Sequence, residues 1–149
     1  MTEMDKIIPS GIFDFPVFPL SENLHEKGTG NNNKHILICL AGTTSTDIHA
    51  FLEKVMSAVG VDLAADALTI PVEEGVQFSF ATLDHQKGFS KALFFGLRPN
   101  DAGLHLNAQK YQPLSIAGKT FLFSDTLQTI QEKPELKRPL WEGLKIMFS

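Results

Sequence analysis

The chain has almost no cysteine and no long apolar run. Its 149 residues contain one cysteine, Cys39, which excludes an internal disulfide framework and any zinc or iron–sulfur site built only from cysteines of this chain. No apolar stretch approaches the roughly 20 residues that a membrane-spanning helix needs, and the first residues lack the basic-then-apolar pattern of a secretory signal. We therefore expect a cytoplasmic protein with one folded domain, no metal and no cofactor.

Basic side chains are scarce in the first part of the chain. Residues 1–84 carry four basic side chains against twelve acidic ones, a net charge of -8, whereas residues 85–149 carry nine against five, a net charge of +4. The total of -4 argues mildly against a dedicated nucleic-acid binder, although such asymmetry can mark a face that meets an anionic partner. Lys133, Lys137 and Arg138 are the candidate phosphate contacts. Solvated lysines scattered over the surface explain the same pattern.

The N-terminal stretch differs in composition from the rest. Residues 11–20 hold three phenylalanines and two prolines, and each proline restricts itself and its predecessor to extended backbone. Residues 26–33, rich in glycine and asparagine, are typical of a flexible polar linker. We therefore predict an apolar extended arm with its linker over residues 1–33 and a single α/β domain over residues 34–149.

The apolar side chains of this arm have two interpretations. They either cover an apolar patch of their own domain or dock on a partner as a short linear motif, and both arrangements remove the aromatic rings from water. The residues concerned are Ile12, Phe13, Phe15 and Phe18.

Residues 34–123 alternate between strand-like and helix-like patterns. Apolar runs predict strands at 35–41, at 65–70, where Pro71 ends the strand, and at 91–97; the first run suits the centre of a parallel sheet. Residues 46–59 place apolar side chains on one helical stripe, with Ser45 or Thr46 as the cap and Gly60 as the stop. Residues 77–83 are ambiguous between an irregular strand and a helical turn.

The remaining segments predict a hairpin and three helices. A short helix is expected near 102–106, and strands at 113–116 and 120–123 flank a tight connection. Ser124 or Asp125 is expected to cap a short helix, and the last helix begins near Leu136 because Pro139 is tolerated only near a helix start. Strands interleaved with helices predict a three-layer α/β/α sandwich with a mostly parallel central sheet.

The C-terminal part carries a recognisable pattern. A strand-to-helix corner at Phe123-Ser124-Asp125 precedes Lys137, Trp141 and Leu144, which follow the spacing Lys-x-x-x-Trp-x-x-Leu. Residues 51–61 are similar to the first helix of the uracil-DNA glycosylase superfamily, and residues 93–96 to its third strand. Over residues 35–148 the chain thus resembles that superfamily, and the resemblance implies its sandwich fold.

The catalytic motifs of that superfamily are replaced in this chain. Residues 40–45 stand where the motif Gly-Glu-x-Pro-Gly would carry the acid that activates water, and residues 68–71 stand where an asparagine would read the base. Phe123-Ser124-Asp125 replaces the motif His-Pro-Ser, whose histidine stabilises the departing uracil anion. Glycosidic cleavage needs both a positioned water and stabilisation of the leaving group. The resemblance therefore implies a vestigial pocket without catalytic residues, formed by Thr43, Thr44, Phe123, Ser124 and Asp125.

Within the superfamily, the chain looks most like the non-catalytic psi subunits of bacterial DNA polymerase III. These share its length, its missing motifs, its Leu-Trp-bearing last helix and an apolar N-terminal arm on a flexible stretch. In that family the arm docks on the collar of the clamp loader, and the folded domain binds the chi subunit. The resemblance implies an accessory scaffold protein, not an enzyme, with clamp-loader subunits and a chi-like subunit as partners.

Two other interpretations stay open at this point. The chain is alternatively a divergent glycosylase-like DNA-binding or DNA-repair protein that uses its basic C-terminal half. In the third interpretation, the arm completes its own fold, within one molecule or across a homodimer.

Overall fold

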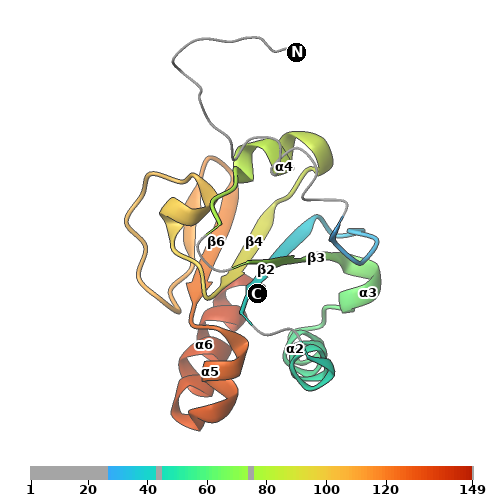
Figure 1. Cartoon of the computed structure of the whole chain (residues 1–149), viewed down its shortest axis with the longest axis vertical. Coiled ribbons are helices and arrows are strands. Elements are labelled where there is room, and N and C mark those ends of the chain that lie inside the picture. Colours follow the sequence, from blue (N-terminus) through green and yellow to red (C-terminus); the bar gives the residue numbers. More distant parts are fainter. Residues whose placement is uncertain (1–26, 43–44, 74–75, 149) are drawn as a thin grey trace.

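Figure 1 shows the computed structural model of the chain, which describes residues 27–42, 45–73 and 76–148. These residues form an α/β unit around a five-stranded sheet with the strand order β3-β2-β4-β6-β5. Strands β2, β3, β4 and β6 run parallel, and β5 pairs antiparallel with β6. The predicted α/β class, the mostly parallel sheet and the hairpin are therefore confirmed. The strands are β2 (Ile36–Ala41), β3 (Ala67–Val72), β4 (Lys91–Phe95), β5 (Leu114–Ile116) and β6 (Lys119–Ser124).

The helices lie on both sides of this sheet. In Figure 1, α2, α5 and α6 lie below it and α4 lies above it. The α-helices are α2 (Thr46–Ala58), α3 (Leu63–Asp66), α4 (Phe80–Lys87), α5 (Leu127–Glu132) and α6 (Lys137–Met147), and the 3-10 turns are η3 (Pro99–Ala102) and η4 (Pro134–Leu136). None of the helices in these ranges is both long and apolar enough to cross a membrane.

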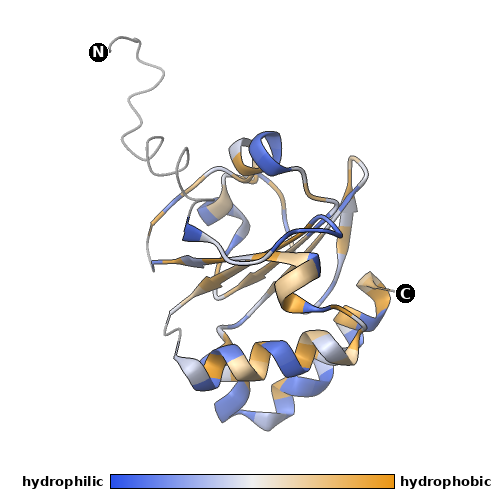
Figure 2. Cartoon of the chain, turned by 90° about the vertical axis from the view of Figure 1, so that its right-hand side faces the viewer, coloured by the Kyte–Doolittle hydropathy of each residue, from blue (hydrophilic) through white to orange (hydrophobic). Residues whose placement is uncertain are grey.

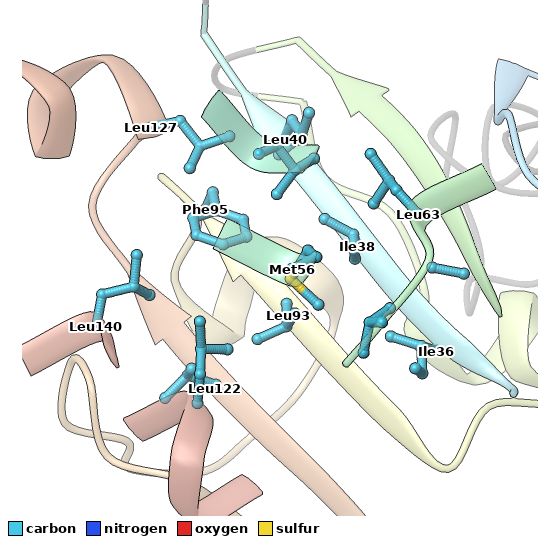
Figure 3. Close-up of a cluster of buried hydrophobic side chains, with 14 of the residues drawn as sticks. Ile36, Ile38, Leu40, Met56, Leu63, Leu93, Phe95, Leu122, Leu127 and Leu140 are labelled. Atoms are coloured by element: carbon cyan, nitrogen blue, oxygen red, sulfur yellow. The ribbon is translucent and has the colours of Figure 1, made fainter. Parts of the chain in front are cut away.

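The two faces of the sheet are packed with different side chains. The face toward α2, α5 and α6 is mainly aliphatic, with Ile38, Leu93 and Leu122 pointing at Met56 and Leu140 from the helices (Figure 3). The helices facing this layer mix apolar and polar residues along their length, while the strands are predominantly apolar (Figure 2). A helix that covers a sheet buries only one of its sides, and this explains why these helices are amphipathic.

The opposite face of the sheet carries a cluster of six phenylalanines among its sixteen buried residues. Phe94 and Phe123 stack with ring centroids 4.9 Å apart and planes 12° apart, and Phe80 of α4 meets Phe121 edge to face at 5.1 Å. Both arrangements are favoured by the ring quadrupole. Large flat rings thus fill the space between α4 and the sheet.

The first strand and helix form as the sequence predicts. All six residues of β2 are buried, because the strand is central and helices cover both its faces. Ser45 caps α2 by accepting a hydrogen bond from the backbone N–H of Ile48 at 3.3 Å. Gly60 follows the helix end with a left-handed φ of 79°, a conformation that glycine adopts without strain.

Two predictions about the strands were wrong in detail. Pro71 does not end the second strand but lies within β3, paired with Leu40. β3 is the edge of the sheet, and proline is tolerated on an edge strand because its missing N–H need not pair with a further strand. The strand also begins later than expected, because residues 65 and 66 belong to α3, whose cap is Asp62.

Three further predictions concern helix positions. Residues 80–87 form α4, with Ser79 as its cap, so the ambiguous segment is helical where it packs Phe80 and Leu83 onto the sheet. The turn η3 occupies 99–102 and not 102–106, with Pro99 at its first position, where proline's fixed φ suits a helix start. The cap of α5 is Thr126, not Ser124 or Asp125, since the Thr126 hydroxyl accepts from the Thr129 N–H at 3.1 Å.

Residues 27–33, predicted to belong to a flexible linker, contact the domain. Thr29 and Thr69 exchange two backbone hydrogen bonds of 2.8 Å, and Asn31 donates to the carbonyl of Ala64 at 2.8 Å. Gly30 lies so close to β3 that a Cβ there would be 2.0 Å from the carbonyl oxygen of Ala67. The packed unit thus extends to Thr29, while the predicted arm residues around Phe13 lie outside the described residues.

Candidate functional site

The resemblance places its vestigial pocket where the parallel strands end. Leu40, Phe95 and Ser124 lie in one row near the carboxyl ends of β2, β4 and β6. Beyond this row, the Gly96 N–H donates to the carbonyl of Ser124 at 2.8 Å. Gly96 has a φ of 82°, and a Cβ there would lie 2.5 Å from Cγ2 of Thr126. The chain after β4 and the corner after β6 are therefore in direct contact.

The corner itself is filled by its own side chains. Phe123 is 2% exposed and Ser124 is 3% exposed. The Ser124 hydroxyl donates to the carbonyl oxygen of Asp125 at 3.1 Å, which satisfies a buried polar group locally. Thr43 and Thr44, the other residues of the predicted pocket, lie outside the described residues.

Asp125 is the carboxylate nearest the corner, and two side chains from the 107–113 loop hold it. Lys110 Nζ donates to Oδ1 at 2.6 Å, and the Tyr111 hydroxyl donates to Oδ2 at 2.5 Å. Partial burial acts to raise the pKa of Asp125, but the hydrogen bonds from Lys110 and Tyr111 outweigh it, so that this pKa lies below its ordinary value. Burial and the hydrogen bond to Asp125 raise the pKa of Tyr111. The carboxylate is therefore charged and the phenol neutral near neutral pH.

Tyr111 links the corner to the last helix. Its backbone N–H donates to the carbonyl of Phe123 at 2.8 Å, and its φ of 67° is unusual for a bulky residue. A Cβ on Gly143 would lie 2.6 Å from the carbonyl oxygen of Tyr111. Glycine in the middle of α6 thus lets the 107–113 loop approach the helix backbone closely.

The three candidate phosphate contacts lie near one another in sequence but differ in surroundings. Arg138 Nε is 3.4 Å from a carboxylate oxygen of Glu142. The Lys137 ammonium lies 5.6 Å from the ring centroid of Phe51. Lys133, at the end of α5, adds to the positive field that lowers the pKa of Asp125. All three side chains are exposed, and two of them already contact groups of this chain.

A second feature, a groove between α2 and α6, was not predicted from the sequence. Its cavity volume is about 230 Å³, and it is open enough to receive apolar side chains from another segment. Trp141 is 38% exposed, Phe51 and Val55 are half-buried, and Leu140 beneath them is buried. We call this feature the α2–α6 groove; its lining residues are Phe51, Lys54, Val55, Ala58, Lys137, Leu140 and Trp141.

The width of the apolar stripe on α2 is the signal that points to this groove. Ile48, Leu52 and Met56 alone supply the buried row of the helix. Phe51 and Val55 form a second row that is only partly buried against the core. A helix that covers a sheet needs only one such face, so an additional apolar row indicates another contact. The sequence does not reveal that Trp141 of α6 lies beside this row.

Residues 27–42, 45–73 and 76–148 contain neither a candidate metal site nor an accessible thiol. Within these ranges, no group of three or more His, Cys, Asp and Glu side chains could hold a metal ion. Cys39 is fully buried, and burial raises the pKa of its thiol well above the usual range. It therefore packs as a small apolar residue.

Comparisons with known proteins add no relative to this picture. No protein-family model matches the chain, and a search of curated proteins found no match either.

Proposed function

We propose that this chain is a catalytically silent, glycosylase-like accessory protein that binds protein partners, most like the psi subunits of bacterial DNA polymerase III. The fold expected from that resemblance is a three-layer α/β/α sandwich. A mostly parallel sheet with helices on both faces supports this expectation.

The observation that carries the proposal is the state of the corner after β6. Phe123 is part of the ring stack in the core, and the polar atoms of Ser124 and Asp125 are engaged by partners within the chain. A base that activates water works best with a pKa near the operating pH. The pKa of Asp125 is instead shifted downward, which suits a structural ion pair better than proton transfer.

The binding role of the proposal is scaffolding by two separate surfaces. The apolar arm residues Ile12, Phe13, Phe15 and Phe18 would insert into a groove on a clamp-loader subunit, and the folded domain would hold a chi-like subunit. Aromatic anchors suit such a role because they bury a large apolar area with few rotatable bonds. An extended proline-containing segment also loses little entropy when it is ordered on a partner.

A titration of the full-length chain against a reconstituted bacterial clamp loader tests this proposal. We expect wild-type binding that weakens by roughly tenfold or more in the Phe13→Ser/Phe15→Ser variant, because anchors of this type dominate binding energies. The matched control is Ile7→Ser/Ile8→Ser, which removes apolar groups from the same segment outside 12–18. A peptide of residues 8–22 should compete with the full chain.

Three results would contradict the proposal. If the full chain shows no detectable binding, the clamp loader is not a partner. If both double variants lose the same amount of affinity, Phe13 and Phe15 are not specific anchors. If the purified chain releases uracil from uracil-containing DNA, it is not catalytically silent. DNA binding that falls steeply with salt would favour instead the alternative based on Lys133, Lys137 and Arg138.

A further inference from the structure

The α2–α6 groove has an apolar floor and a basic rim. Its floor is formed by Phe51, Val55, Leu140 and Trp141, and Lys54 and Lys137 stand among its lining residues. The Lys137 ammonium lies 5.6 Å from the Phe51 ring centroid and the Lys145 ammonium 5.7 Å from that of Trp141. A segment that carries both aromatic side chains and carboxylates complements such a surface.

Residues 1–26 of this chain supply a segment with that chemistry. They contain five acidic side chains (Glu3, Asp5, Asp14, Glu22 and Glu26) and one basic side chain (Lys6), a net charge of -4. Asp14 stands between Phe13 and Phe15. In an extended backbone, two residues separated by one position share a face. Both rings can therefore face an apolar floor while the carboxylate between them faces the solvent side, where lysine ammonium groups lie.

The described chain begins beside the helix that forms the groove. Thr29 and Gly30 line a surface depression together with His49 and Glu53 of α2. The 14 residues from Phe15 to Thr29 span up to about 46 Å when extended, whereas a helix with its side chains is only about 10–12 Å across. A segment tethered so closely has an effective concentration on the order of millimolar at the groove.

We propose that residues 12–18 bind in the α2–α6 groove of the same molecule. The rings of Phe13 and Phe15 face Phe51 and Trp141, and the Asp14 carboxylate faces Lys54 and Lys137. This goes beyond the proposed function, because it gives the arm a resting position on its own domain. A partner that takes the arm must then compete with the groove, and taking the arm exposes Trp141.

Trp141 is the only tryptophan of the chain, so its fluorescence reports groove occupancy directly in the full-length protein. We expect Phe13→Ser/Phe15→Ser to shift the emission to longer wavelength and to raise quenching by acrylamide about twofold or more. At a millimolar effective concentration, a segment whose Kd for the groove is well below millimolar keeps the wild-type groove filled. The control Ile7→Ser/Ile8→Ser should leave both readings unchanged.

Charge substitutions test the rim independently of the rings. Lys54→Glu/Lys137→Glu should raise acrylamide quenching of Trp141 as Phe13→Ser/Phe15→Ser does. Adding Asp14→Lys to the lysine variant should restore the protection of Trp141 from acrylamide. Lys87→Glu, on α4 at the other face of the sheet, serves as the control. Far-ultraviolet circular dichroism checks that each variant is folded.

Unchanged emission and quenching in the ring variant would overturn the proposal. Protection that disappears on dilution of the wild-type chain would overturn it as well, because it would mean that a second copy supplies the segment. These readings need no clamp loader. A negative result therefore leaves the proposed function untouched, and failure to bind a clamp loader leaves the groove proposal untouched.

Discussion

The corner after β6 and the α2–α6 groove both use residues from the C-terminal part of the chain, but their side chains differ in how far the protein itself satisfies them. At the corner, the polar groups of Ser124, Asp125 and Thr126 have partners within the protein. In the groove, the helices and the sheet leave apolar surface of Phe51 and Trp141 uncovered. The polar groups of the corner are used in contacts that stabilise the fold, whereas the groove leaves apolar surface that another segment can cover.

The physical costs explain this difference. A buried polar atom without a partner costs about 1–3 kcal/mol, so Ser124 and Asp125 at a partly buried corner require the contacts that they make. An apolar side chain on the surface costs nothing in the folded state, but it forgoes about 25 cal/mol for each Å² that could be buried. A partner that covers Trp141 recovers this free energy on binding.

The largest expected effect on stability is at the corner. Phe123→Ala should lower the free energy of unfolding by about 3–5 kcal/mol, because it leaves a cavity next to Phe94 in the ring stack. Denaturant unfolding measures this, with Phe51→Ala as the control. A loss as large in the control as at Phe123 would mean that the groove is as much a part of the core as the corner.

Gly143→Val is expected to have the next largest effect. The new Cβ would meet the Tyr111 carbonyl at 2.6 Å, and relieving this overlap must move either the loop or α6, at about 1–3 kcal/mol. Ile146→Val, at a position that is 66% exposed on the same helix, provides the control and should change stability very little. Equal stability of the Gly143 variant and the wild type would contradict the close approach.

Asp125→Asn should lower the unfolding free energy by about 1 kcal/mol at neutral pH, since solvent reaches part of this ion pair. The folded-state pKa of Asp125 lies below its ordinary value of 3.8. Its contribution is therefore fully present above that value and is lost as the pH falls through the lower folded-state pKa. The stability difference between wild type and variant should narrow below about pH 4.

Urea unfolding at a series of pH values measures this difference. Glu142→Gln is the matched control, because it removes the exposed partner of Arg138 and should cost no more than about 0.5 kcal/mol. A stability difference for Asp125→Asn that does not change on acidification would show that the carboxylate charge plays no part.

Trp141→Ala should have the smallest effect on stability, within about 1 kcal/mol, because this side chain lies at the surface of α6. The unfolding must be followed by circular dichroism, since the variant has no tryptophan. If Trp141→Ala lowered the free energy of unfolding as much as Phe123→Ala, the groove would be as important for stability as the corner.

Sequence patterns predicted much of the fold because they follow local rules. The continuous apolar run of β2, the Ser45 cap of α2 and the start of the last helix before Pro139 need no knowledge of distant neighbours. Some errors were local shifts of a cap or a turn by a few residues, and one arose where a distant neighbour decides. Pro71 is accepted because β3 is an edge strand, and the order of strands in a sheet cannot be seen from one segment.

The candidate sites show the same limit. The sequence located Phe123, Ser124 and Asp125 at a strand-to-helix corner, but it gave no sign that Lys110 and Tyr111, more than a dozen residues earlier, would hold Asp125. Likewise it placed Phe51 and Trp141 in two predicted helices without bringing those helices together. Hydrogen-bond partners and groove walls depend on how elements pack, and the spacing within each element does not determine that.

The sequence by itself determined the alternation of strands and helices, the buried row of each element and the polar residues at the corner. Those properties follow from side-chain periodicity and from residue identity. Only the tertiary structure decided that Asp125 is held by Lys110 and Tyr111 and that α2 and α6 form a groove with a lysine-bearing rim. Such features require residues distant in sequence to converge, and convergence is set by the packing of the whole sheet and its helices.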